Sequence, residues 1–100
     1  METYEVKLTP RALQDLDSIY AYIAQSLMES DTALKLLSRL EDAIFSLEQL
    51  PQRGALRKTG AYANRSYRQL LIENYIVIYR VDEVHRQVIL LTVQYSHRKI

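Results

Sequence analysis

The segment from residue 66 to residue 95, SYRQLLIENYIVIYRVDEVHRQVILLTVQY, contains three apolar runs separated by two short polar stretches. The runs are rich in Ile, Val, Leu and Tyr, which favour β-strands, and they lie at 66–73, 75–81 and 88–95. Glu73-Asn74 leaves room only for a tight turn between the first two runs. Since short connections join antiparallel neighbours, this segment predicts a three-stranded antiparallel meander.

The first eight residues and the region after them predict a strand followed by a helix. Residues 4–8, YEVKL, alternate apolar and polar side chains, which is typical of a strand. Thr9 can cap a helix whose first residue is Pro10, because proline has a suitable fixed φ and no N–H that needs a partner. The expected apolar stripe of this helix recurs at steps of three and four, at Leu13, Leu16, Tyr20, Ile23 and Leu27.

A second helix is expected to begin at Ser30 or Asp31 and to end before Leu50-Pro51. Its stripe consists of Ala33, Leu36, Leu37, Leu40, Ile44 and Leu47. The two helices are joined by a few residues only and should form an antiparallel hairpin. Residues 51–65, PQRGALRKTGAYANR, contain both glycines and are predicted to be a loop.

The order of elements predicts an α+β fold with an N-terminal strand, an antiparallel helical hairpin and a three-stranded antiparallel meander. With 100 residues, the chain forms a single domain, 1–100. The neighbour of the first strand stays open. Because the run at 75–81 is apolar on both faces, a tail, the helices or a protein partner should cover more than one face of the sheet.

Composition excludes several classes of protein. The chain has no Cys, no run of 18 apolar residues and no secretory signal pattern in METYEVK, so we expect a cytoplasmic protein without disulfides. No glycine-rich phosphate loop or HExxH motif is present. His85 and His97 are too few for a histidine metal site, and no carboxylates are paired for acid–base chemistry, so no metal or cofactor is expected.

Charge is distributed unevenly along the chain. Up to residue 52 there are 4 Lys/Arg and 9 Asp/Glu, a net charge of −5, whereas the remainder has 9 Lys/Arg and 3 Asp/Glu, a net charge of +6. This split indicates an anionic partner for the second half, either a phosphate backbone or an acidic protein segment. The alternative is that these side chains only keep the protein soluble.

Basic and aromatic residues of the second half are the candidate functional residues. Arg68 and Arg80 lie on neighbouring predicted strands and could share a sheet face if the pairing register allows. Alternatively, the stem of Arg68 packs on the sheet with its head in water. Tyr95 closes the last predicted strand, next to His97 and Arg98. Metal-free RNA cleavage would need such a set, with fixed positive charge and groups that move protons.

The order strand–helix–helix–loop–meander resembles the RelE/ParE superfamily of small bacterial toxins from type II toxin–antitoxin pairs. The stretches that carry the resemblance are YEVKLTPRALQDLDSIYAYIA at 4–24, LPQRG at 50–54, YRQLLIENYIVIYRVD at 67–82 and VILLTVQYSHRKI at 88–100. The resemblance implies an antitoxin partner and one of two activities, inhibition of DNA gyrase or metal-independent cleavage of mRNA on the ribosome. A non-toxic antitoxin-binding module is a further alternative.

The stretch DLDSIYAYIA at 15–24 and the chain length look more ParE-like, which favours the gyrase inhibitor over the mRNA endonuclease. If the chain cleaves RNA, the resemblance implies that the catalytic residues are Arg68, Tyr95, His97 and Arg98. The residues expected to bind the nucleic acid or another target are Arg53, Arg57, Lys58, Arg65 and Arg80. A toxin–antitoxin hetero-oligomer is expected in either case.

Overall fold

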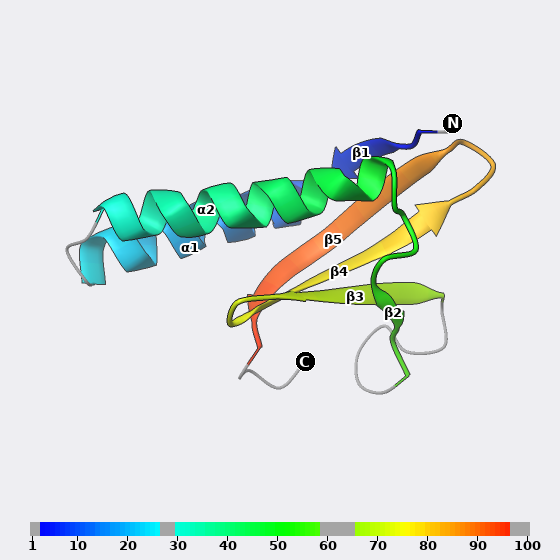
Figure 1. Ribbon diagram of the computed structural model, residues 1–100. Coiled ribbons are helices and arrows are strands. Elements are labelled where there is room, and N and C mark those ends of the chain that lie inside the picture. The colour runs from blue at the N-terminus through cyan, green and yellow to red at the C-terminus, as the bar shows by residue number, and fades with distance from the viewer. Residues whose placement is uncertain (1–2, 27–29, 59–65, 97–100) are drawn as a thin grey trace.

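Two helices lie side by side over one face of a five-stranded sheet in the computed structural model, which describes residues 3–26, 30–58 and 66–96 (Figure 1). The elements are β1 (Glu5–Leu8), α1 (Pro10–Ser26), α2 (Ser30–Phe45), the 3-10 helix η1 (Ser46–Glu48), β2 (Ala55–Leu56), β3 (Tyr67–Ile72), β4 (Tyr75–Asp82) and β5 (Gln87–Tyr95). This order confirms the predicted α+β fold of strand, helical hairpin and meander.

The strands are arranged in the order β1-β5-β4-β3-β2. The neighbour of β1, which the sequence left open, is β5, and the two strands run parallel with Val6 opposite Val88. The other pairs are antiparallel, as predicted for the meander. The prediction of a loop throughout 51–65 is wrong at Ala55–Leu56, where two residues pair with β3 as strand β2.

The start of α1 follows the predicted capping chemistry. The hydroxyl oxygen of Thr9 accepts a hydrogen bond from the backbone N–H of Ala12 over 3.1 Å, and Pro10 is the first helical residue. The predicted stripe is wrong at Leu13, which is 53% exposed, because Ala12 faces the sheet instead and is completely buried. Leu27, the last residue of that stripe, lies outside the described residues.

The core lies between the helices and the inward-facing side chains of the central strands. It contains Ala12, Leu16, Leu40, Ile44, Leu47, Tyr75, Val77, Tyr79, Val88, Leu90 and Val93. Residues alternate between faces along a strand, so Ile76 and Ile78 lie on the opposite side of the sheet, here called the outer face. Both are buried as well, which confirms that β4 buries apolar side chains on both faces.

Candidate functional site

The pairing register places Arg68 and Arg80 on opposite faces of the sheet. Arg68 on β3 lies opposite Tyr79 on β4, whereas Arg80 lies opposite Tyr67. Since paired residues share a face and Tyr79 belongs to the core, Arg68 is on the helix-covered face and Arg80 is on the outer face. The two arginines therefore cannot form the shared site that a different register would have allowed.

The outer face carries a line of residues that crosses the sheet, which we call the basic row. Tyr67 lies opposite Arg80, Arg80 lies opposite Ile89, and Ile89 lies opposite Lys7. At the β2 end, the backbone N–H of Arg57 donates to the carbonyl oxygen of Tyr67 over 2.8 Å, so Arg57 continues the line. Strands are spaced by about 5 Å, so the backbones of Arg57, Arg80 and Lys7 lie at intervals of about 10 Å.

The three cations of the basic row differ in their partners. Lys7 forms an ion pair with Glu5 at 3.2 Å, and the guanidinium of Arg57 donates to the side-chain oxygen of Gln69 over 2.8 Å. Among the described residues, the half-buried Arg80 side chain makes no hydrogen bond or ion pair. In this respect Arg80 differs from Lys7 and Arg57.

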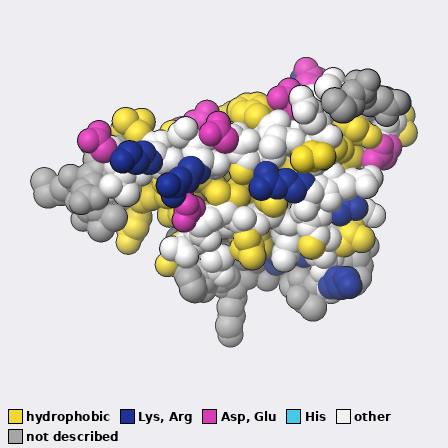
Figure 2. Space-filling view, in the orientation of Figure 1, with side chains coloured by type: hydrophobic (Ala, Val, Ile, Leu, Met, Phe, Trp, Pro, Cys, Tyr) yellow, Lys and Arg dark blue, Asp and Glu magenta, His cyan; other side chains and the backbone are white. Residues whose placement is uncertain are grey.

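Side chains of both charges are visible on the molecular surface seen from the side of the helices (Figure 2). Figure 2 shows Lys and Arg side chains at the β2 end of the molecule, whereas positive and negative side chains are mixed along the helices. The acidic Asp82 stands close to the row, and its pKa is lowered, chiefly by hydrogen bonds from His85 and to a smaller extent by the charge of Arg80.

On the helix-covered face, Arg68 and Tyr79 hold the backbone that leads into β2. The Tyr79 hydroxyl donates to the carbonyl oxygen of Pro51 over 2.9 Å and accepts from the N–H of Gly54 over 2.8 Å. The guanidinium of Arg68 donates to the carbonyl oxygen of Gly54 over 2.7 Å. Tyr79 is completely buried, and burial raises the pKa of its hydroxyl, so the group stays protonated at neutral pH.

The other predicted site residues are dispersed. Arg53 donates to the Ser46 hydroxyl over 2.8 Å, and Lys58 is exposed at the end of a described stretch. The ring of Tyr95 packs edge-on against Tyr75, with centroids 5.6 Å apart, at the first residue of β4 and four residues from Tyr79. The candidates Arg65, His97 and Arg98 lie outside the described residues.

A cleft of about 570 Å³ lies between α1 and the ends of β4 and β5. It is lined by Arg11, Asp15, Ser18, Ile19, Tyr22, Tyr75, Val93, Gln94 and Tyr95. The pattern of apolar residues did not reveal this cleft, because its helical wall includes polar positions of α1. The recurrence of Arg11, Asp15, Ser18 and Tyr22 at steps of three and four is the one signal that places them on a common helical face.

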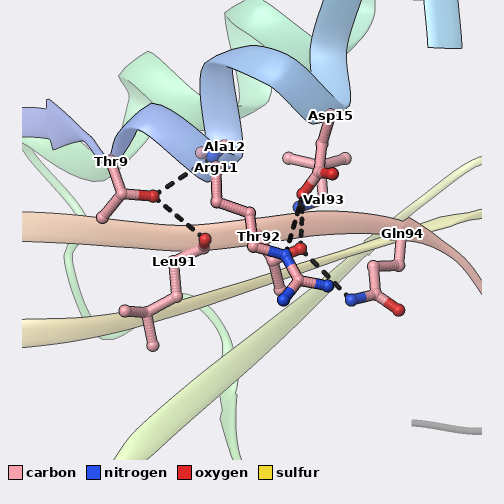
Figure 3. Close-up of polar contacts among 8 residues, drawn as sticks. All are labelled: Thr9, Arg11, Ala12, Asp15, Leu91, Thr92, Val93 and Gln94. Carbon is pink, nitrogen blue, oxygen red and sulfur yellow. Dashed lines mark hydrogen bonds and ion pairs between the residues drawn. The ribbon is translucent and has the colours of Figure 1, made fainter. Parts of the chain in front are cut away.

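Asp15 joins the two walls of this cleft (Figure 3). Its carboxylate accepts hydrogen bonds from the Thr92 hydroxyl over 2.5 Å and from the backbone N–H of Val93 over 3.1 Å, and Arg11 lies 3.9 Å away. β1 ends opposite Leu90, so on that edge of β5 the Thr9 hydroxyl bonds to the Leu91 carbonyl oxygen, and Asp15 of α1 accepts from the Val93 N–H. This contact fixes how α1 lies against the sheet.

Two further findings concern residues 3–26, 30–58 and 66–96. They contain no group of three or more His, Asp or Glu side chains that could hold a metal ion. They also contain no helix that is long and apolar enough to cross a membrane.

Comparison with protein families gives a match over nearly the whole sequence. Residues 6–100 match the family described as "ParE toxin of type II toxin-antitoxin system, parDE". The chain belongs to this ParE toxin family. No curated protein sequence matches the chain significantly. The membership confirms the RelE/ParE resemblance, including its ParE-like character.

Solved structures share the fold of this ParE-family chain. A chain from the chromosomal ParDE system of P. aeruginosa is 24% identical with a TM-score of 0.75, covering 93% of this chain and 96% of that one. A chain of the RelBE2 toxin–antitoxin complex of Mycobacterium tuberculosis is 23% identical with a TM-score of 0.68, covering 95% and 93%. A chain of the E. coli RelBE complex is 14% identical with a TM-score of 0.61, covering 95% and 99%. At these identities the likeness shows the fold.

In this chain, the strand register separates two of the residues that the resemblance implies for RNA cleavage. Arg68 on β3 lies opposite Tyr79 of β4, whereas Tyr95 on β5 lies opposite Tyr75 of β4. The two residues are therefore on strands at either side of β4 and are offset by four residues along it. Strand spacing and rise place the two backbones roughly 16 Å apart. The guanidinium of Arg68 also donates to Gly54 and points toward β2 rather than toward Tyr95.

Proposed function

We propose that the chain is an active toxin, that it acts in the bacterial cytoplasm by inhibiting DNA gyrase, and that a cognate antitoxin neutralises it in a hetero-oligomeric complex. Membership of the ParE toxin family over residues 6–100 is the observation that carries this proposal. The ParE-like assignment favours gyrase over the ribosome. The separation of Arg68 from Tyr95 supports the same choice, because the pair does not form a compact site for moving protons.

The basic row supplies a contact surface for the target. Arg57 directly follows β2, Arg80 lies on β4 and Lys7 lies on β1, and all three stand on one face; the guanidinium of Arg80 has no ion-pair partner among the described residues. Arginine binds phosphate and carboxylate oxygens through paired N–H groups, so the row suits either DNA phosphates or acidic side chains of a protein. We therefore assign the row to the toxin's contact with gyrase or with the DNA that gyrase holds.

The first test is pulse-labelling of DNA and protein synthesis in bacteria minutes after the chain is induced alone, together with supercoiling by purified gyrase. We expect DNA synthesis to fall first and supercoiling to be inhibited. Arg57→Ala and Arg80→Ala should each weaken inhibition by about tenfold, as expected for lost charged contacts at an interface. Lys35→Ala removes one charge from the exposed face of α2 and should change nothing.

Each other outcome favours a different activity. If protein synthesis falls first, the runner-up of ribosome-dependent mRNA cleavage replaces gyrase, and the same row then becomes an RNA-binding surface. If neither synthesis falls, toxicity is excluded and a non-toxic antitoxin-binding module remains. If Arg57→Ala and Arg80→Ala inhibit gyrase as strongly as the unaltered chain, the basic row is not the contact surface.

We assign the antitoxin to the cleft between α1 and the ends of β4 and β5. Its floor is apolar at Ile19 and Val93, and its walls carry two aromatic rings, Tyr22 and Tyr95, that are 65% and 41% exposed. Exposed tyrosines beside an apolar floor suit an amphipathic segment of a partner protein. Arg11 on the rim adds a cation that an acidic antitoxin segment would neutralise.

Antitoxin binding by the cleft is tested with Tyr22→Ala in pull-down and titration against a co-expressed antitoxin. An aromatic anchor at an interface accounts for a large share of binding, so we expect the affinity to fall by about tenfold or more. The matched control is Leu34→Ala, which removes an exposed apolar side chain of 53% exposure from α2, outside the cleft. Equal loss in both variants, or none in Tyr22→Ala, would reject the cleft as the antitoxin site.

A further inference from the structure

Strand β2 leads into Arg57, one end of the basic row, but has little pairing of its own. It consists of Ala55 and Leu56, which lie opposite Gln69 and Arg68, and one further backbone hydrogen bond joins Arg57 to Tyr67 over 2.8 Å. Two paired residues at the end of a sheet are weakly held, because short edge segments open easily. The position of Arg57 therefore depends on whatever else holds this backbone against β3.

Additional hydrogen bonds to this backbone come from the helix-covered face of the sheet. Tyr79 and Arg68, on the helix-covered face, make three hydrogen bonds of 2.7–2.9 Å to the backbone of Pro51 and Gly54. A Cβ atom built on Gly54 would lie 2.5 Å from the carbonyl oxygen of Gln69 and 2.8 Å from the Tyr79 hydroxyl. The backbone is thus held so closely that only glycine fits, and it leads directly into β2.

We propose that Arg68 and Tyr79 are positioning residues for target recognition. They hold β2 on β3 from the helix-covered face, and this keeps Arg57 in the basic row on the outer face, about 10 Å from Arg80. The proposal rests on the proposed function, in which the row contacts the target. It gives Arg68 a role different from the direct catalytic one that the family resemblance implies.

The geometry explains why Arg68 acts through Arg57 and not by itself. Its guanidinium is bonded to the Gly54 carbonyl oxygen, on the face opposite Arg80 and Tyr67, and so it does not reach a partner seated on the row. If β2 detaches for part of the time, only the fraction of molecules with β2 in place can use Arg57. The observed affinity then falls in proportion to that fraction, so a tenfold loss of the paired form weakens this contribution about tenfold.

A double-mutant cycle separates positioning from general stability. Tyr79→Phe and Arg68→Met should each weaken gyrase inhibition in the unaltered chain by up to about tenfold. In the Arg57→Ala background the two substitutions should cause almost no further loss of inhibition, because the side chain that they position is already absent. In the Lys7→Ala background, at the other end of the row, their effects should add in full. Circular dichroism and urea unfolding identify the variants that remain folded.

The second readout does not depend on the identity of the target. Hydrogen exchange of the Arg57 amide, which is bonded to Tyr67, should become about tenfold faster in Tyr79→Phe and in Arg68→Met, whereas the Val77 amide in the centre of β4 should keep its rate. Arg68→Lys retains one donor for the Gly54 carbonyl and should restore part of the protection.

Failure of this inference can be distinguished from failure of the proposed function. If the chain does not inhibit gyrase at all, the proposed function fails, and the cycle is then measured on growth inhibition in cells while exchange still tests positioning. Unchanged exchange at Arg57 overturns the inference. So does a full additional loss of inhibition for Arg68→Met in the Arg57→Ala background, because Arg68 would then contact the target itself.

Discussion

The side-chain hydroxyl of Tyr79 in the centre of the sheet accepts a hydrogen bond from the backbone N–H of Gly54 over 2.8 Å. The same hydroxyl donates to Pro51, so one buried oxygen serves two backbone groups that precede β2. In the sequence, Tyr79 is 25 positions from Gly54 and 28 positions from Pro51. The contact therefore closes a long loop and joins the end of the helical hairpin to the sheet.

Replacing Tyr79 with Phe should destabilise the protein by about 1–3 kcal/mol, because the Gly54 N–H and the Pro51 carbonyl lose their partner at a buried site. Urea unfolding followed by circular dichroism measures this difference. Tyr22→Phe is the matched control, since it removes a hydroxyl from a ring that is 65% exposed and should cost almost nothing. A Tyr79→Phe chain as stable as the unaltered one would show that the bridge adds no net stability.

Alkaline pH should weaken the fold through the same hydroxyl. Burial raises the pKa of Tyr79 above its ordinary value of 10.0, so its contribution is complete below that value and is lost as pH rises toward the folded pKa. The pKa of Tyr75 is raised too, chiefly by burial, and acts in the same direction. Urea unfolding from about pH 8 to about pH 11 should show a fall in stability that is smaller in Tyr79→Phe.

Gly54→Ala should destabilise the protein by about 1–3 kcal/mol, as expected for a methyl group forced into a filled space. The new carbon would lie 2.5 Å from a backbone oxygen of Gln69, and backbone in a paired strand moves less readily than a flexible side chain. Thermal and urea unfolding measure the loss, and Ala55→Ser, at an exposed neighbouring position, is the control. Equal stability of the two variants would mean that β2 can shift away from β3.

The order of helices and strands could be predicted because each has a local pattern, whereas β2 could not. Ala55 and Leu56 are too few to show alternation, and they pair with β3 because Gly54 approaches Gln69 and Tyr79 closely. The faces of Arg68 and Arg80 depend on the register between β3 and β4, and a shift of one residue would have put both side chains on the same face. The basic residues were therefore found from sequence, but their division between two faces was not.

The orientation of α1 illustrates the same limit. A stripe through Leu13 and a stripe through Ala12 both fit helical spacing, and hydrophobicity favours the larger side chain. In the structure, Asp15 bonds to Thr92 and Val93, and Thr9 bonds to Leu91, which turns Ala12 toward the sheet. Polar contacts between distant segments set this rotation, and they leave no periodic signal in the sequence.

The contact of Asp15 with β5 gives the last prediction. Asp15→Ala should cost about 1–3 kcal/mol, since the buried Thr92 hydroxyl and the Val93 N–H lose their acceptor. Asp15→Asn keeps a side-chain oxygen and should cost less. The matched control is Asp17→Ala, which removes an exposed carboxylate two residues along α1. Urea unfolding measures stability, and faster exchange of the Val93 amide locates the loss. If Asp15→Ala and Asp17→Ala lower the free energy of unfolding equally, the negative charge of α1, rather than this contact, stabilises the helix on the sheet.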